Sequence, residues 1–140
     1  MNRTWYDEPF NVTSEVVVIG ERIALVLVDD DEQILVIVSQ YLSFSGFDVH
    51  TFNNPLTALE FIREHQPRVV ISDVRMEPIN GFEFSKQING LPSPPQVILM
   101  TGYYQREFEA LAEASGVAKI LEKPVRGDDL VQIVRQLIYP

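Results

Sequence analysis

The sequence contains no cysteine among its 140 residues. This absence excludes scaffolds stabilised by disulfides or by thiolate-bound metals. Basic residues are also few, because 11 Lys and Arg stand against 20 Asp and Glu, for a formal net charge of −9. An acidic surface repels phosphate backbones and anionic lipids, so we expect no direct binding to nucleic acid and no binding to membranes.

Long apolar segments are missing as well. The longest uninterrupted one, Ile23–Val28, is far shorter than the about 20 residues of a bilayer-spanning helix. The first residues, Met1–Glu8, lack the apolar region of a signal peptide, and we expect a cytoplasmic protein. With 46% hydrophobic residues, a chain of this length can bury one self-sufficient core.

Five short apolar segments alternate with five segments of helical periodicity. The predicted strands are 23–28, 47–52, 68–72, 96–100 and 118–121. The predicted helices are 31–44, 55–64, 82–89, 103–115 and 128–138. This alternation predicts an α/β fold with a doubly wound, five-stranded parallel sheet and helices on both faces, over residues 23–140. Residues 1–22 form an N-terminal extension, in which Glu15–Gly20 is either an extra strand, a partner-binding segment or part of a frayed tail.

Polar residues follow four of the predicted strands. They are Asp29-Asp30-Asp31-Glu32, Asp73, Thr101-Gly102 and Glu122-Lys123-Pro124. In open parallel sheets, ligands bind beyond the carboxyl ends of the strands, so these side chains are expected at one edge. Neither cysteine nor histidine is available there as a nucleophile.

The residue types at this edge indicate phosphoryl chemistry. Two carboxylates about 4 Å apart repel each other by about 4 kcal/mol at an effective dielectric of 20, unless a cation lies between them. Carboxylate and carbonyl oxygens suit Mg²⁺, which prefers to share its ligands with a phosphoryl group. Asp73 can then form an acyl phosphate, Lys123 and Thr101 can contact its oxygens, and Gly102 leaves space for it.

Four segments in this order resemble the receiver domain of bacterial two-component response regulators. They are Leu25–Glu32, Ile71–Gly81, Val97–Gly102 and Leu121–Pro124, and the resemblance covers about residues 22–140. It implies a flavodoxin-like receiver fold with strand order 2-1-3-4-5. It also implies a signalling switch that catalyses only its own phosphorylation and dephosphorylation, rather than an enzyme acting on other substrates.

The resemblance assigns roles at the acidic edge. Asp73 matches the phosphoacceptor, Asp30 a direct Mg²⁺ ligand, and Asp29 a carboxylate that acts through metal-bound water. Arg75 would supply its backbone carbonyl to the metal. Thr101 matches the hydroxyl that moves toward the phosphoryl group.

Two further assignments concern the end of the fifth strand and the phosphoryl pocket. Lys123 matches the ammonium that pairs with the phosphorylated aspartate, and Pro124 commonly follows a cis bond in this family. Gly102 borders the phosphoryl group.

The resemblance also implies partners. The first helix carries one apolar stripe expected to face the sheet, Leu35, Val38 and Leu42, and a second that includes Ile34 and Ile37. Ile34 and Ile37 are our candidate contacts to a sensor histidine kinase or histidine phosphotransfer protein. The alternative is a helix buried more broadly, under the N-terminal extension. We expect the output face on the fourth helix, fifth strand and fifth helix, and we leave a homodimer open.

Several positions depart from the family pattern. Ile120 replaces the usual aromatic residue three positions before Lys123, so this chain lacks the aromatic side chain whose rotation is coupled to the switch threonine in the family. Glu77 stands where proline is usual, with Pro78 one place later. Arg75 and Tyr103 occupy two positions that influence phosphoryl lifetime, and both are bulky, so we predict a long-lived phosphoaspartate.

Two other functions remain open from the sequence. A haloacid-dehalogenase-type phosphatase would use the Asp-x-Asp step of Asp29–Asp31, the segment Val97–Thr101 and the late pair Asp128-Asp129, but would leave Asp73 idle. A phosphorylation-independent interaction module is favoured by Ile120 alone.

Overall fold

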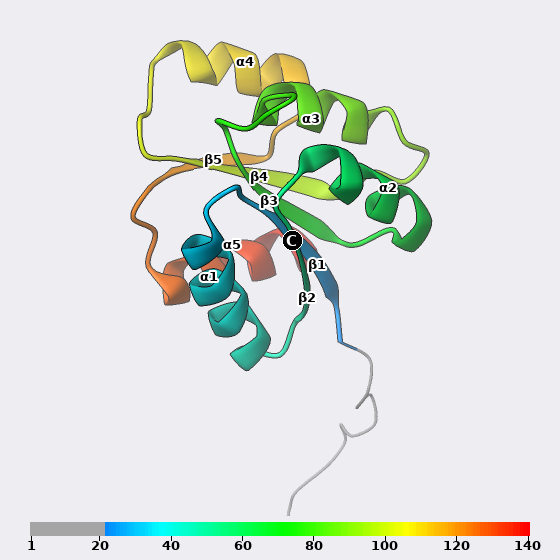
Figure 1. Ribbon diagram of the computed structural model, residues 1–140, viewed down its shortest axis with the longest axis vertical. Helices are drawn as coiled ribbons and strands as arrows, with labels where there is room; N and C mark the ends of the chain where they lie inside the picture. The colour runs from blue at the N-terminus through cyan, green and yellow to red at the C-terminus, as the bar shows by residue number, and fades with distance from the viewer. Residues whose placement is uncertain (1–21) are drawn as a thin grey trace, which may run out of the picture.

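The computed structural model describes residues 22–140, so the interpretations of residues 1–21 lie outside the described residues. Strands and helices alternate through this part of the chain (Figure 1). The strands are β1 Ala24–Val28, β2 Asp48–Phe52, β3 Val69–Asp73, β4 Gln96–Thr101 and β5 Lys119–Glu122. The helices are α1 Glu32–Phe44, α2 Pro55–His65, α3 Gly81–Asn89, α4 Glu107–Ser115 and α5 Gly127–Ile138.

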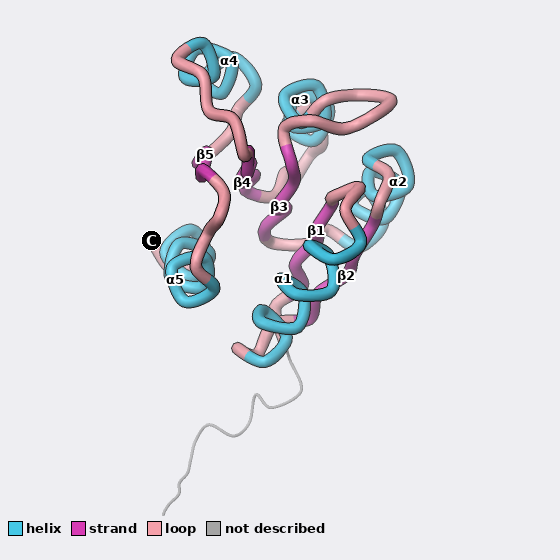
Figure 2. Tube along the Cα trace, turned by 60° about the vertical axis from the view of Figure 1, so that its left-hand side comes forward, coloured by secondary structure: helices cyan, strands magenta, loops and turns pink. Residues whose placement is uncertain are grey.

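The five strands form one parallel sheet in the order β2-β1-β3-β4-β5, as predicted. Helices α1 and α5 lie on one face of the sheet, and α2, α3 and α4 lie on the other (Figures 1 and 2). The central strands are buried on both faces, which explains their continuous apolar sequences.

The sheet separates two hydrophobic clusters. One lies under α2, α3 and α4 and includes Phe84 and Leu99. The other lies under α1 and α5 and includes Leu35 and Leu42, which confirms that this stripe of α1 faces the sheet. At roughly 25 cal/mol per Å² of apolar surface, these two layers are the main source of stability.

Local side-chain hydrogen bonds cap the starts of α1, α2 and α3. The Asp31 carboxylate accepts the N–H of Gln33 at 2.9 Å and caps α1, and the Asn54 side chain accepts the N–H of Leu56 at 2.8 Å and caps α2. Asn80 and Glu83 form a reciprocal capping box at α3. These hydrogen bonds fix the direction in which α1, α2 and α3 leave the carboxyl edge of the sheet.

The predicted start of α4 at residue 103 was wrong, because the helix begins at Glu107. The N–H of Tyr103 donates to the Thr101 hydroxyl oxygen at 3.1 Å. Such a local side-chain bond gives the backbone an alternative to a helical hydrogen bond. The Arg106 side chain makes no capping hydrogen bond, so residues 102–106 remain a loop at the edge of the site.

Candidate functional site

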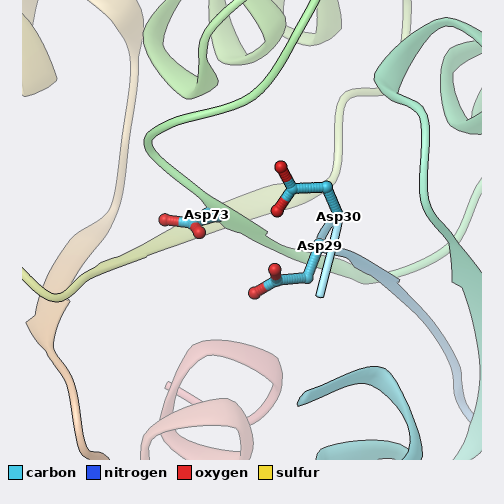
Figure 3. A group of neighbouring side chains, drawn as sticks. All are labelled: Asp29, Asp30 and Asp73. Carbon is cyan, nitrogen blue, oxygen red and sulfur yellow. The ribbon is translucent and has the colours of Figure 1, made fainter. Parts of the chain in front are cut away.

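Three aspartates meet where β1 and β3 end. Asp29 and Asp30 directly follow β1, and Asp73 is the last residue of β3. These strands are neighbours in the sheet, with Val28 opposite Ser72, so both chain segments reach the same edge. One oxygen from each carboxylate lies within 4.8 Å of the others (Figure 3).

Lys123 lies between two of these carboxylates. Its Nζ is 3.1 Å from Asp29 Oδ2 and 3.2 Å from Asp73 Oδ2. The Asp29 side chain is only 1% exposed and that of Asp73 is 15% exposed. Asp73 is therefore the member of this ion-paired group that a phosphodonor can reach, and Asp29 lies beneath it.

Burial and charge act against each other in this group. Burial raises the pKa of Asp29, and the Asp31 N–H and the Lys123 ammonium offset this only in part. Burial alone would lower the pKa of Lys123, but its hydrogen bond and charge interaction with Asp29, together with the charge of Asp73, raise it. Lys123 is consequently a cation at neutral pH.

The donor atoms fit a small, hard cation. Ligands around Mg²⁺ at about 2.1 Å lie about 3 to 4.2 Å apart, so oxygens within 4.8 Å need only a small closure or a bridging water. All three donors are carboxylates, which Mg²⁺ prefers over nitrogen and sulfur ligands. Asp29 is also held in position, because its Oδ1 accepts the N–H of Asp31 at 3.0 Å.

Thr101 and Gly102 lie on the neighbouring strand end. Thr101 is the last residue of β4 and is buried, with its hydroxyl oxygen accepting the N–H of Tyr103. A Cβ added at Gly102 would meet nothing within 4 Å, so the space beside this residue is open. The structure thus brings the predicted hydroxyl, ammonium and carboxylates to one edge.

Arg75 and Tyr103 are in contact across the loops that follow β3 and β4. The Arg75 Cζ lies 5.4 Å from the centre of the Tyr103 ring, within the range of a cation–π interaction. The Arg75 N–H also points to Asp73 Oδ1 at 3.4 Å. The sequence indicated that both side chains are bulky, but no sequence signal indicated that they touch.

Ile34 and Ile37 line an apolar groove beside the acidic cluster. Its volume is about 470 Å³, and its other walls include Tyr41, Lys123 and Pro124. Ile37 is 66% exposed, so within the described residues α1 is not buried on this side. This part of α1 is open at the rim of the site.

The structure shows how the residues that depart from the family pattern, and the prolines near the site, are arranged. Ile120 lies in β5 and packs, partly buried, on the α2, α3 and α4 side of the sheet. Both the Glu77–Pro78 and the Lys123–Pro124 bonds are cis. Gly81 retains its contact with the site segment, because its N–H donates to the Val74 carbonyl at 2.8 Å.

Comparison with known proteins places this arrangement in a family. Residues 25–135 match the family model "Response regulator receiver domain". The chain belongs to the response regulator receiver domain family. Receiver domains of two-component response regulators are signalling switches that act through phosphorylation, and the family typically binds Mg²⁺ at an acidic pocket.

Curated relatives share the domain at moderate identity. The chain is 31% identical over 114 residues to the regulatory protein AtoC of Escherichia coli, covering 81% of this chain and 25% of AtoC. It is 32% identical over 114 residues to a CpxR homolog of Haemophilus influenzae, covering 81% of this chain and 49% of that protein. The chain therefore spans between a quarter and about half of these relatives.

Solved structures agree with the fold. A CheY-like receiver domain protein from Methanospirillum hungatei aligns with a TM-score of 0.79 at 25% identity, covering 85% of this chain and 96% of the other. The chemotaxis regulator CheY4 of Vibrio cholerae aligns with a TM-score of 0.77 at 26% identity, covering 84% and 99%. Within residues 22–140, no helix is both long and apolar enough to cross a membrane.

Proposed function

We propose that Asp73 accepts a phosphoryl group from a phosphohistidine in a Mg²⁺-dependent reaction. The observation that carries this proposal is the group formed by Asp29, Asp30, Asp73 and Lys123. Of its three acids, only Asp73 both pairs with the lysine and has a partly exposed carboxylate. The three carboxylates and the backbone carbonyl of Arg75 would hold the metal. When bound, Mg²⁺ supplies positive charge to the oxygens of the transferred group.

The transfer needs little beyond positioning and charge. An Asp73 oxygen attacks phosphorus, the new O–P bond forms as the N–P bond of phosphohistidine breaks, and the bonding pair returns to the imidazole nitrogen. Lys123 already contacts Asp73 and would neutralise the added negative charge. The Thr101 hydroxyl would donate to a phosphoryl oxygen, while its oxygen still accepts from Tyr103.

Burial argues against the phosphatase alternative. In that mechanism Asp29 would be the nucleophile, yet its side chain is 1% exposed and hydrogen-bonded to both Lys123 and the Asp31 N–H. A substrate phosphate cannot approach it without displacing Lys123. Asp128, part of the late acidic pair, is instead engaged with Arg126 at 3.2 Å.

Phosphorylation would be transmitted through Thr101. Movement of its hydroxyl toward Asp73 would pull the Tyr103 backbone, to which it is hydrogen-bonded, and would shift the loop that leads into α4. The Tyr104 hydroxyl in this loop donates to the Glu109 carboxylate at 2.9 Å, so a shift of the loop would move the start of α4 with it. We therefore assign the output to the face built by α4, β5 and α5.

We assign kinase docking to Ile34 and Ile37. They line the groove that ends at Lys123 and Pro124, so a partner helix seated there would bring its phosphohistidine to the acidic edge. The partner would be a sensor histidine kinase or histidine phosphotransfer protein. A cytoplasmic location remains a prediction.

The contact between Arg75 and Tyr103 supports a long-lived phosphoaspartate. The Arg75 backbone N–H points to Asp73 Oδ1, and we infer that the paired side chains of Arg75 and Tyr103 restrict the approach of an attacking water. Tyr103→Ala is expected to speed loss of the phosphoryl group by about tenfold, which corresponds to about 1.4 kcal/mol in the barrier. A wild-type lifetime of only seconds after donor removal would contradict this proposal.

The experiment that tests the main proposal uses acetyl phosphate and Mg²⁺, followed by intact-mass measurement. Wild type should gain one phosphoryl group, and Asp73→Asn and an EDTA-treated sample should gain none. Hydrolysis of p-nitrophenyl phosphate is the second readout. Turnover lost in Asp29→Asn but kept in Asp73→Asn would instead establish the phosphatase, and intact labelling would exclude the phosphorylation-independent module.

A further inference from the structure

The outward face of α1 carries almost no charge. Among its 13 residues Glu32 is the only charged one, and four large apolar side chains are exposed: Val36 at 51%, Ile37 at 66%, Tyr41 at 45% and Phe44 at 96%. A surface helix usually presents charged and polar residues to water. In a protein with a net charge of −9, an uncharged helix face indicates a surface that contacts another protein.

Four apolar residues on this face form a stripe with a regular spacing. Ile34, Ile37, Tyr41 and Phe44 follow one another at intervals of three, four and three, which is the spacing of a helix that packs along a second helix. The intervals are the same from either end. A two-fold axis at the height of residue 39 therefore places Ile34 opposite Phe44, and Ile37 opposite Tyr41, of an antiparallel copy of α1.

The shape of the surface matches this pairing. Phe44 projects from the end of α1, whereas Ile34, Ile37 and Tyr41 line the apolar groove of about 470 Å³. In the antiparallel arrangement, Phe44 of each copy lies opposite Ile34 of the other and enters that groove. A projecting residue and a groove on the same face are what a self-complementary, two-fold interface requires.

The two ends of α1 also carry charges of opposite sign. The Arg135 Nη2 donates to the Ser45 carbonyl at 3.2 Å, which places a guanidinium at the C-terminal end of α1. The same two-fold axis brings this guanidinium to the height of the N-terminal end of α1 in the other copy, where the acidic residues Asp30 and Asp31 precede the helix. Antiparallel packing also places the opposite ends of the two helix dipoles next to each other.

We propose that a second copy of this chain packs antiparallel on α1 through Ile34, Ile37, Tyr41 and Phe44. The stripe covers less than the about three to four heptads of a stable coiled coil, so the dimer is weak and depends on concentration. It buries Ile34 and Ile37, which we assigned to kinase docking. The dimer and the docked kinase therefore exclude each other.

Sedimentation velocity at concentrations from about 10 µM to about 1 mM measures the association. Wild type should shift from monomer to dimer, and Phe44→Ser should weaken the dimer by at least about tenfold. Phe44 is 96% exposed, so this change leaves the folded monomer intact. Leu56→Ser is the matched control, because Leu56 is 45% exposed on α2 across the sheet, and it should associate like wild type.

A cross-linking experiment tests the register. The chain has no cysteine, so Gln40→Cys introduces a single thiol beside the two-fold axis. A short bismaleimide should join two such chains and should not join Leu56→Cys chains.

Three outcomes would overturn the dimer: a wild type that stays monomeric, a Phe44→Ser variant that associates like wild type, or equal cross-linking of the two cysteine variants. Acetyl phosphate labelling of the same samples keeps this test separate from the proposed function. If wild type stays monomeric but is labelled normally, the dimer proposal is refuted and the proposed function still stands. Equal labelling of wild type and Phe44→Ser, with dimerisation lost only in the variant, supports both proposals.

Discussion

Replacing Gly81 with alanine is expected to destabilise the fold and to disturb the site at the same time. An alanine Cβ at this position would lie 2.6 Å from the Asp73 carbonyl oxygen, 3.0 Å from the Val74 Cα and 3.1 Å from the Leu99 Cδ2. The leucine methyl can move, but the other two atoms belong to the backbone that presents the Asp73 carboxylate. The N–H of Gly81 fixes the approach further through its bond to the Val74 carbonyl.

The magnitude follows from these contacts. Overpacking costs about 1–3 kcal/mol, and two immobile backbone contacts place this substitution near the upper end. The better helix propensity of alanine at the start of α3 offsets less than about 1 kcal/mol of this loss of stability. A net loss of about 2–3 kcal/mol would lower the melting temperature by about 4–12 °C in a domain of this size.

Urea unfolding followed by circular dichroism measures this loss. Gly102→Ala is the matched control, because a Cβ there meets nothing within 4 Å and Gly102 is not in the left-handed region. The control should change stability by less than about 0.5 kcal/mol. Labelling of Gly81→Ala by acetyl phosphate should also be slower than wild type, since the strand end that carries Asp73 must shift. Equal stabilities for Gly81→Ala and Gly102→Ala would refute the steric argument.

Three other predictions concern the charges and the core. Lys123→Met should destabilise the protein by about 2–4 kcal/mol in the absence of Mg²⁺, because the buried Asp29 carboxylate loses its partner; urea unfolding with a stability at or above wild type would contradict this. Mg²⁺ at ten times its dissociation constant should stabilise wild type by about 1.4 kcal/mol, measured by thermal unfolding, and Asp30→Asn should lose most of this gain; an equal shift in both would place the ion elsewhere. Leu42→Ala should cost about 2–5 kcal/mol in chemical unfolding, whereas the exposed Leu56→Ala should cost far less, and similar losses would contradict the packing of α1.

Residues at strand ends were the easiest to predict. Asp29, Asp73, Thr101 and Lys123 each follow or end an apolar strand, and parallel strands bring their carboxyl ends to one edge whatever the details of packing. The start of α1 was also predictable, since Asp31 lies in the sequence position that favours a cap. Topology and local capping thus determine most of the site.

Contacts between side chains in loops could not be predicted. Arg75 and Tyr103 meet across two loops 28 positions apart, and their contact depends on rotamers that no spacing encodes. The start of α4 was misplaced for a related reason, because the bond from the Tyr103 N–H to Thr101 competes with the first helical turn. Helical periodicity identifies an apolar residue such as Phe44 but does not show that neighbouring elements leave it exposed.

The proposed phosphotransfer requires Asp73, and neither Asp29 nor Asp30, to receive the phosphoryl group. Borohydride reduces an acyl phosphate of aspartate to homoserine, so protein treated with acetyl phosphate and Mg²⁺, then reduced and mapped by peptide mass spectrometry, shows the modified position. We expect homoserine at position 73 and unchanged aspartates at positions 29 and 30. Homoserine at position 29 or 30, or none in Mg²⁺-treated protein, would contradict the proposed phosphotransfer.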